Sequence, residues 1–182
     1  DKFINFFGKN SLVIDCTFSK DQSLFEAIKQ VQKDAEIAVR QGVTQIILSD
    51  KELSESNLPI PMLLCVGAIN SFLIEKKLRG YVSINVQSGE ALDTHSFATL
   101  IGVGATTVNP YLAFDSLYQR HEKKLFGKFS FDECVDRYIK SVNAGLLKIM
   151  SKMGISVLSS YRGGCNFETV GLSRTIVADY FP

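Results

Sequence analysis

The sequence lacks the features that mark several classes of partner. It has no block of five like charges, and its 20 basic and 19 acidic residues leave a formal net charge of +1. Such a balanced chain offers no electrostatic basis for binding nucleic acid or an anionic membrane. The longest apolar run, residues 62–69, is interrupted by Gly67 and is far shorter than the roughly 20 residues that span a bilayer. We therefore expect no nucleic acid and no membrane as a partner.

Cysteine and histidine are scarce and poorly spaced for metal binding. The four cysteines, at positions 16, 65, 134 and 165, form no CxxC pair, which predicts buried reduced thiols rather than a disulfide or a zinc site. His95 and His121 have no acidic or thiol partner at ligand spacing, so we expect no metal site. We expect His95 to form hydrogen bonds in the core or an interface, and His121 to be solvated. Reduced thiols and the lack of a visible signal peptide predict a cytoplasmic protein.

Short apolar runs alternate with helical patterns along most of the chain. Strands are predicted at residues 12–16, 44–48, 81–86, 106–108 and 155–158. A capping box at Ser19-x-x-Gln22 predicts a helix that ends near Arg40, and further helices are predicted at 62–78 and about 91–101. A second capping box, Ser130-x-x-Glu133, begins the longest helix. Its expected buried stripe is Val135, Tyr138, Ile139, Val142, Leu146, Ile149 and Met153.

This alternation determines the predicted fold class. Strands separated by helices of ten to twenty residues require right-handed crossovers and a parallel sheet, so the fold is α/β with flanking helices. Five strands are too few for a closed eight-stranded barrel, which takes about 250 residues, and we expect an open sheet or an incomplete (βα) barrel. Residues 1–182 are treated as a single α/β domain or segment, in which the charged stretch 115–130 forms a surface excursion.

Polar residues follow each predicted strand, where parallel α/β folds collect their ligands. Asp50, Asn109 and Arg162 are the candidate binding residues at this rim. Capping of the following helices explains the same polar residues without a ligand. No histidine accompanies them, so the sequence specifies no acid-base pair or triad, and we predict no catalytic, cofactor-binding or metal-binding residue.

Three glycine turns are candidates for binding an anion through backbone amides: Ser88-Gly89-Glu90, Gly102-x-Gly104 and Arg162-Gly163-Gly164. None matches GxGxxG or GxxxxGK[ST]. The third turn offers an arginine that could hold a phosphate or a carboxylate. An ion pair between Arg162 and Glu168 is an equally physical use of that arginine.

Several segments together carry a family resemblance. Residues 140–172 read KSVNAGLLKIMSKMGISVLSSYRGGCNFETVGL, and ILSD at 47–50, IPMLLCVGA at 60–68 and NPYLA at 109–113 add to the pattern. In this order the segments resemble the central domain of the glutamate synthase large chain, which lies between a glutaminase domain and an FMN-binding barrel. The resemblance implies a barrel-like α/β domain, in agreement with the fold predicted from periodicity.

The resemblance also implies a function. Glutamate synthases are oxidoreductases that make two glutamates from glutamine and 2-oxoglutarate, with FMN and an iron-sulfur cluster. This segment lacks the family's amino-terminal nucleophilic cysteine, FMN loops and clustered cysteines, so we expect it to contain no cofactor and to be inactive alone. Its implied role is mainly structural: it links the glutaminase and synthase sites and lines part of the ammonia tunnel. The implied partners are the glutaminase and FMN-binding domains of the parent chain, and a reductase subunit or ferredoxin.

Other interpretations remain open from the residues alone. The chain could be a free-standing small-molecule-binding module or enzyme with its site at the strand carboxyl ends, or an interaction domain without a ligand. An uncovered apolar sheet edge would favour a segment of a longer protein and would let the isolated chain self-associate. The compartment would be the plastid stroma if the source were a photosynthetic eukaryote.

Overall fold

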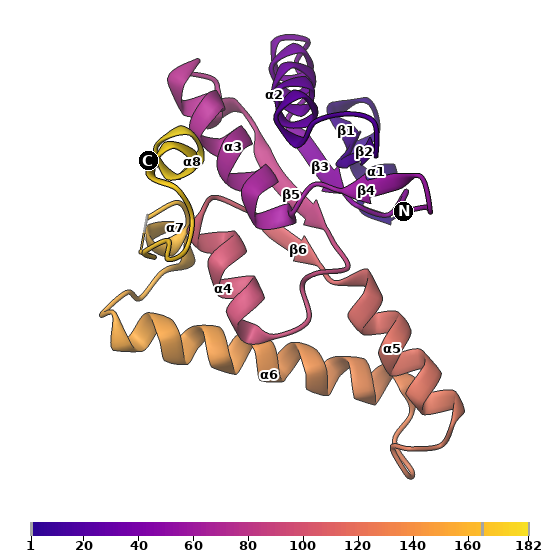
Figure 1. Ribbon diagram of the computed structural model, residues 1–182. Coiled ribbons are helices and arrows are strands. Elements are labelled where there is room, and N and C mark those ends of the chain that lie inside the picture. Colours follow the sequence, from indigo (N-terminus) through magenta and orange to yellow (C-terminus); the bar gives the residue numbers. More distant parts are fainter. Residues whose placement is uncertain (1, 165, 182) are drawn as a thin grey trace.

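A four-stranded parallel sheet forms the centre of the molecule. The computed structural model describes residues 2–164 and 166–181. The strands are β1 (Ser11–Asp15), β3 (Gln45–Ser49), β5 (Ser83–Gln87) and β6 (Thr107–Asn109), in the order β1-β3-β5-β6. Each strand therefore lies beside the strand of this sheet that precedes it in the chain, as in part of a (βα) barrel (Figure 1). The predicted α/β class with an open parallel sheet is confirmed.

Three helices connect these strands and form one layer against the sheet: α2 (Leu24–Arg40), α3 (Met62–Glu75) and α4 (Thr94–Gly102) (Figure 1). The helix α2 buries one apolar face, which includes Ile28, Val31 and Ala35. After its last residue, Gly42 adopts a positive φ of 91°, as expected at a helix end. Short 3₁₀ turns, η1 (Gly8–Asn10) and η2 (Arg79–Tyr81), precede β1 and β5. Helix α1 (Lys2–Phe7) lies before η1.

The two faces of the sheet differ in polarity. The register aligns Ile14 with Leu48 and Val86, and these buried side chains belong to the main apolar core with α2 and α3. Neighbouring residues along each strand point to the opposite face. That face carries Ser11, Val13, Asp15, Gln45, Ile47, Ser49, Ser83, Asn85, Gln87, Thr107 and Asn109. One face is thus apolar and covered by helices, and the other is mostly polar.

A small two-stranded sheet at the carboxyl ends of the strands corrects one prediction. The strands β2 (Thr17–Ser19) and β4 (Asn57–Pro59) pair antiparallel, with Ser19 opposite Asn57. Because this pairing keeps Ser19 extended, the predicted capping box at Ser19-x-x-Gln22 is wrong. The helix begins instead after Ser23, whose hydroxyl accepts from the backbone N–H of Glu26 at 3.2 Å.

The predicted strand at 155–158 is also wrong. After the helix α6 (Phe131–Lys152), Gly154 turns with a φ of 71°, and the N–H of Ile155 bonds back to the carbonyl of Met150. The chain then forms the short helix α7 (Leu158–Tyr161). Tyr161 is buried beside Met150 and helix α4, and its hydroxyl donates to the carbonyl of Ala98 at 3.1 Å. The apolar run therefore packs against helices and does not extend the sheet.

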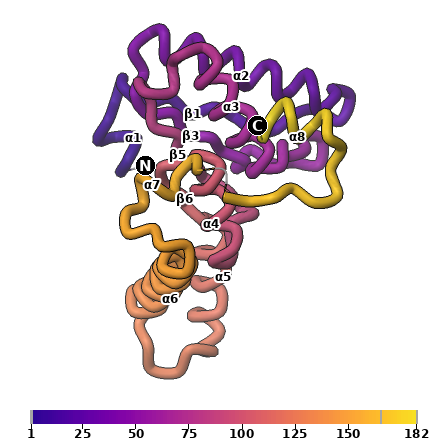
Figure 2. The backbone as a smooth tube through the Cα atoms, turned by 90° about the vertical axis from the view of Figure 1, so that its left-hand side faces the viewer, coloured from indigo at the N-terminus to yellow at the C-terminus, as the bar shows by residue number. Residues whose placement is uncertain are grey.

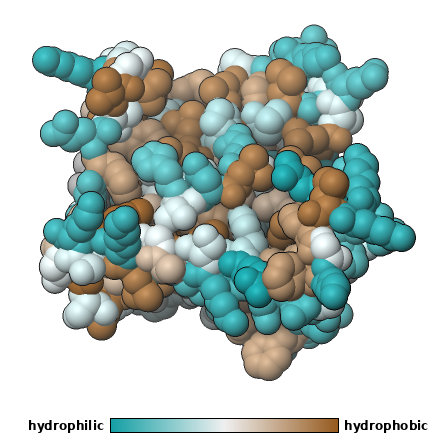
Figure 3. Space-filling model, turned by 90° about the horizontal axis from the view of Figure 1, so that it is seen from below, coloured by the Kyte–Doolittle hydropathy of each residue, from teal (hydrophilic) through white to brown (hydrophobic). Residues whose placement is uncertain are grey.

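The long helix α6 packs against α4 and the helix α5 (Tyr111–Glu122) (Figures 1 and 2). The predicted capping box of Ser130 and Glu133 is present. The expected buried stripe is only partly correct, because Ile139 and Met153 are each 41% exposed. Only one side of the helix meets neighbours, and apolar patches lie among polar side chains on the surface seen from below (Figure 3).

The stretch 115–130 comprises the later part of α5 and the turns that lead to α6, and most of its residues are exposed. Within it, His121 was expected to be solvated. It is instead partly buried against Phe131, with Nε2 3.2 Å from the carbonyl oxygen of Phe129.

The last described element, α8 (Arg174–Tyr180), packs against α3 (Figure 1). Between residues 2 and 181, leaving out 165, the structure contains no helix with the length and apolar character of a membrane span.

Candidate functional site

Asp50 is the most buried of the three candidate rim residues, with 1% of its surface exposed. It follows β3, and its carboxylate accepts a 2.6 Å hydrogen bond from the Ser88 hydroxyl. The backbone N–H of Gly89 donates to the two carboxylate oxygens at 3.1 and 3.2 Å. The Ser88-Gly89-Glu90 turn therefore does bind an anion, and that anion is a side chain of the same molecule.

Tyr111, the first residue of α5, lies over this turn. A Cβ atom placed on Gly89 would lie 3.1 Å from the Tyr111 hydroxyl, so the turn and the phenol are in close contact. Burial, followed by a hydrogen bond to Asp50, raises the pKa of Tyr111 to about 12. The phenol thus stays protonated at neutral pH and acts as a further hydrogen-bond donor to Asp50.

Glu90 provides a second carboxylate at the same rim. Its Oε2 accepts from the backbone N–H of Met62 at 2.9 Å, at the start of α3. The preceding residue, Pro61, provides no side-chain cap, so Glu90 caps this helix from a distant part of the sequence. Burial raises the pKa of Glu90, the bond from Met62 opposes that shift, and the nearby charge of Asp50 adds to it.

These contacts show where the structure places the three predicted site residues. Asp50 and Asn109 lie at the same end of the sheet. Asn109 is exposed, and its backbone carbonyl accepts from the Ser88 N–H at 3.1 Å. Arg162 lies elsewhere, because the strand expected to carry it to the rim does not exist. It stands next to Gly163, whose N–H bonds to the carbonyl of Ile101 near the end of α4. Among the residues that the structure describes, no ion pair joins Arg162 to Glu168.

Sequence reasoning missed the role of Arg79 at the amino end of the sheet. Its guanidinium donates to the Asn70 side chain at 2.7 Å, to the Val82 carbonyl at 2.6 Å and to the Gly104 carbonyl at 2.8 Å. Burial, followed by the charge of Arg162, lowers the pKa of Arg79. One side chain thus joins α3, the start of β5 and the turn before β6. Its only sequence signal was a basic residue at a helix end, which is too common to predict these bonds.

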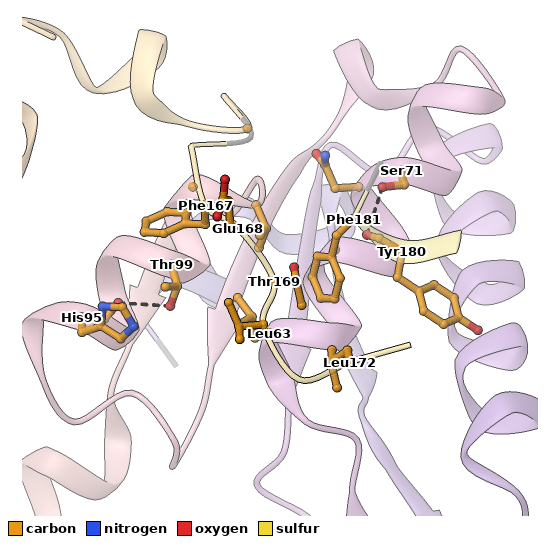
Figure 4. A pocket seen from close by; sticks show the side chains of 16 residues that line it. Leu63, Ser71, His95, Thr99, Phe167, Glu168, Thr169, Leu172, Tyr180 and Phe181 are labelled. Atoms are coloured by element: carbon orange, nitrogen blue, oxygen red, sulfur yellow. Dashed lines mark hydrogen bonds between the residues drawn. The ribbon is translucent and has the colours of Figure 1, made fainter. Parts of the chain in front are cut away.

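A cavity of about 300 Å³ lies between α3, α4 and the segment 163–172 (Figure 4). Leu63, Phe167 and Phe181 contribute apolar walls, and Thr99 and Ser71 add hydroxyl groups. Both hydroxyls are engaged: Thr99 donates to the His95 carbonyl at 3.0 Å, and Ser71 donates to the Tyr180 carbonyl at 3.2 Å (Figure 4). The lining also includes the polar side chains of His95, Glu168 and Thr169, so the cavity combines apolar walls with polar groups.

His95 lies at the edge of this cavity and is exposed. Of the two expected places for it, the core is wrong, and an interface stays a prediction. The His95 ring meets Phe167 edge-on, with 6.4 Å between the ring centres. A Cβ atom on Gly102 would overlap the Phe167 ring, and one on Gly67 would lie 2.5 Å from Phe181. The two glycines thus let two aromatic rings pack directly on the backbones of α4 and α3, and this contact holds the C-terminal segment in place.

Within residues 2–164 and 166–181, no cluster of three His, Cys, Asp or Glu side chains could hold a metal ion. Within the same described residues, no basic side chain is hydrogen-bonded to the carboxylates of Asp50 and Glu90. The two carboxylates join distant elements, because Asp50 holds the turn after β5 and Glu90 caps α3. Capping had instead predicted that Asp50 would cap the helix that follows it, whose first N–H bonds to Glu90.

Comparison with known proteins identifies the family. A model of the family described as the glutamate synthase central domain matches residues 4–173. The chain is 48% identical to the glutamate synthase [NADPH] large chain of Azospirillum brasilense over 98% of its own length and 12% of that protein's. It is also 48% identical to the Bacillus subtilis large chain, over 92% of this chain and 11% of that one. The ferredoxin-dependent glutamate synthase of Cyanidium caldarium is 41% identical over 90% of this chain and 11% of its own.

Solved structures support the fold alone. Dihydroorotate dehydrogenase of Eimeria tenella in complex with ferulenol aligns with a TM-score of 0.56 and 15% identity, over 87% of this chain and 38% of that one. A flavocytochrome b2 variant with benzoylformate aligns with a TM-score of 0.55 and 16% identity, over 82% and 38%. Both are α/β barrel enzymes, of which the present sheet matches a part. On the family match and the extent of identity, the chain belongs to the glutamate synthase central domain family.

Proposed function

We propose that this chain acts within a glutamate synthase as a mainly structural domain, which links the glutaminase and FMN-dependent synthase domains. The observation that carries this proposal is that hydrogen bonds from the same chain already occupy the Asp50 carboxylate at the rim. Asp50, at the place where parallel α/β folds bind ligands, is already bound by Ser88 and Gly89 of the same chain. An Asp50 carboxylate satisfied by internal hydrogen bonds supports a role in holding elements together and argues against the alternative of a free-standing enzyme with its site there.

The parent reaction would be the reductive synthesis of two glutamates from glutamine and 2-oxoglutarate. The chain spans about an eighth of the Azospirillum relative's length, at 12%, so most of that protein lies outside it. Its partners would be the glutaminase and FMN-binding domains of the same parent chain, together with a reductase subunit or ferredoxin as electron source. A cytoplasmic or plastid stromal location belongs to the same proposal.

The residues present do not fit the cofactors of the parent enzyme. An FMN phosphate needs free backbone amides or basic side chains, whereas the candidate turn donates its Gly89 N–H to Asp50 and lies beside the carboxylate of Glu90. An iron-sulfur cluster needs several converging thiolates. Of the cysteines within residues 2–164 and 166–181, Cys16 and Cys65 touch each other in the core, and Cys134 lies in α6. We therefore assign both cofactors to other parts of the enzyme.

The polar face of the sheet supports a further part of the proposal, that the domain lines some of the ammonia path. Thr107 donates to Asn85 at 2.8 Å, and Asn85 donates to Gln45 at 3.1 Å. Amide and hydroxyl groups of this kind can exchange hydrogen bonds with a small polar molecule.

At the edge of the sheet, Leu12 and Val13 of β1 are 41% and 43% exposed. This apolar edge fits a domain that packs against more of its parent protein, and self-association of the isolated chain stays a prediction.

The test uses the complete enzyme with Asp50→Asn. This change weakens the contact between β3 and the Ser88-Gly89 turn without removing a group that touches substrate. A linking role predicts that FMN content is unchanged while glutamate formed per glutamine hydrolysed falls, because ammonia escapes between the sites. The matched control is Asp115→Asn, an exposed acid in α5. Full coupling with a reduced rate of the chemical step would contradict the proposal and indicate a direct part in the reaction.

A further inference from the structure

We propose that Cys16 and Cys65 form a site of covalent modification, at which a small-molecule disulfide such as oxidised glutathione converts the two thiols into one intramolecular disulfide. This site is independent of the proposed linking function. It joins the end of β1 to the first turns of α3, next to the two-stranded sheet of β2 and β4.

The two sulfur atoms are already in contact. Cys65 Sγ lies 3.5 Å from Cys16 Sγ, and the residues are 1% and 0% exposed. A disulfide bond is about 2.05 Å long, so the sulfurs must approach each other by roughly 1.5 Å, a distance that small side-chain rotations can provide. Such rotations leave the surrounding backbone bonds of the sheet and the helix in place.

The backbone around each cysteine is fixed on both sides. The Cys16 N–H donates to the Ser49 carbonyl at 2.7 Å, and the Cys16 carbonyl accepts from Ile60 at 2.8 Å. The Cys65 N–H donates to the Pro61 carbonyl at 3.0 Å. These bonds hold the two thiols opposite each other, which favours their reaction with one another over reaction with a second large molecule.

Access to the buried thiols requires local opening, and the fold provides a weak element beside them. Cys16 directly precedes β2, and Pro61, which starts the turn that carries Cys65, follows β4. The two-stranded sheet of β2 and β4 has strands of only three residues each, so few backbone bonds must break for it to open. The hydrogen bond between the thiols, followed by burial, raises the pKa of Cys16 well above its ordinary value. The thiolate is therefore rare in the closed form, and opening of this two-stranded sheet limits the rate.

The chemistry proceeds in two exchange steps. One protein thiolate attacks a sulfur of the small disulfide, forms a mixed disulfide and releases one small thiolate. The second protein thiolate then attacks the protein sulfur of that mixed disulfide, forms the Cys16–Cys65 bond and releases the second small thiolate. The two protein thiols lose two electrons and two protons, and the small disulfide is reduced to two thiols.

The contact distance predicts which product accumulates. The second step is intramolecular between atoms that start 3.5 Å apart, so the mixed disulfide of this pair is short-lived. Cys134 differs, because within residues 2–164 and 166–181 no other thiol contacts it. In a chain with Cys165→Ser, oxidation at Cys134 therefore stops at the mixed disulfide.

The experiment uses the chain with Cys134→Ser and Cys165→Ser, so that only the pair remains. After incubation with oxidised glutathione and alkylation of free thiols, intact-mass analysis should show a species two hydrogens lighter that takes up no alkylating agent. Peptide mapping should then find the Cys16 and Cys65 peptides joined. The disulfide should raise the melting temperature by about 5 to 10 °C, as expected for a cross-link that closes a long loop.

The control adds Cys65→Ser, which should yield the glutathione adduct of Cys16 as its only oxidised product. If the paired chain stays reduced under conditions in which the control is modified, or accumulates the mixed disulfide, the proposal is wrong. Should the control fail to fold, peptide mapping of the paired chain decides alone: joined peptides support the site, and their absence after full oxidation of the glutathione pool overturns it.

Discussion

The two faces of the parallel sheet differ in the side chains that they carry. On the face toward the helices, side chains such as Ile46, Leu48 and Ile84 are completely buried and form the centre of the apolar core. On the opposite face, Thr107, Asn85 and Gln45 form a chain of side-chain hydrogen bonds across three strands. Parallel sheets usually bury apolar residues on both faces. The difference indicates that the apolar face stabilises the domain, whereas the polar face can form hydrogen bonds with other molecules or domains.

The polar groups at the strand ends follow the same division. The Ser49 hydroxyl donates to the Gln87 side chain at 3.0 Å on the polar face. The next residue, Asp50, is buried and accepts from the Ser88 hydroxyl. Two adjacent residues at the end of β3 thus make their hydrogen bonds in different places. Substitutions on the helix-covered face should affect stability most, and those on the polar face and rim progressively less.

The largest effect is expected from Leu48→Ala, which removes a fully buried side chain from the helix-covered face. The lost burial and the resulting cavity should lower the free energy of unfolding by about 3 to 4 kcal/mol. Urea denaturation followed by circular dichroism measures this. Val13→Ala, on the other face and 43% exposed, should cost less than about 1 kcal/mol. Equal losses from the two substitutions would remove the distinction between the faces.

Arg79→Lys tests how the helix layer is tied to the amino end of the sheet. A lysine cannot reproduce the three directed bonds to Asn70, Val82 and Gly104, and it leaves buried acceptors unpaired. We expect a loss of about 2 to 3 kcal/mol in thermal or chemical unfolding. Arg120→Lys in the exposed part of α5 is the matched control and should be neutral. A neutral Arg79→Lys would show that these bonds add little to stability.

Asn85→Ala probes the polar face directly. The change leaves the Thr107 hydroxyl and the Gln45 amide without their partner, at a cost of about 1 to 2 kcal/mol. The loss is expected to be smaller than that of Leu48→Ala because water can replace some of the bonds on this face. Denaturant unfolding of both variants in one buffer gives the comparison. A larger loss for Asn85→Ala than for Leu48→Ala would reverse the roles assigned to the two faces.

The smallest effect concerns the pH dependence contributed by Glu90. Its pKa is raised in the folded state, chiefly by burial, so its contribution to stability is complete below the ordinary glutamate value of about 4.3 and declines as pH rises through the folded pKa. Because the group is partly exposed, solvent screening should keep the effect below about 1 kcal/mol. Glu90→Gln should remove this decline and be slightly more stable at neutral pH. A decline that persists in Glu90→Gln would assign it to another group.

The sequence predicted the parts of this structure that depend on local order. The capping box of Ser130 and Glu133 lies within four residues, and the parallel direction of β1, β3 and β5 follows from the alternation of strands and helices. The predictions that were wrong depend on contacts between residues far apart in the sequence. Ser19 resembled a helix cap, but pairing with Asn57 in β4 keeps it extended. The run at 155–158 resembled a strand, but the chain turns there so that Tyr161 packs against α4 and donates to the Ala98 carbonyl.

The candidate site divides in the same way. The placement of Asp50 and Asn109 at one end of the sheet followed from the topology, since all strands of a parallel sheet end at the same rim. That the Asp50 carboxylate fills the Ser88-Gly89 turn could not be read from either segment alone. Arg162 was placed at the rim only through the strand that does not form. The bonds of Arg79 join three separate segments and left no local pattern.

Isothermal titration calorimetry of the 182-residue chain with FMN, glutamine and 2-oxoglutarate tests most directly whether the rim is structural. Because Asp50 and the Ser88-Gly89 turn already satisfy each other, we expect no saturable heat from any of the three ligands. Saturable one-to-one binding of any of them, abolished by Asp50→Asn, would show that the rim is a ligand site and would contradict the account.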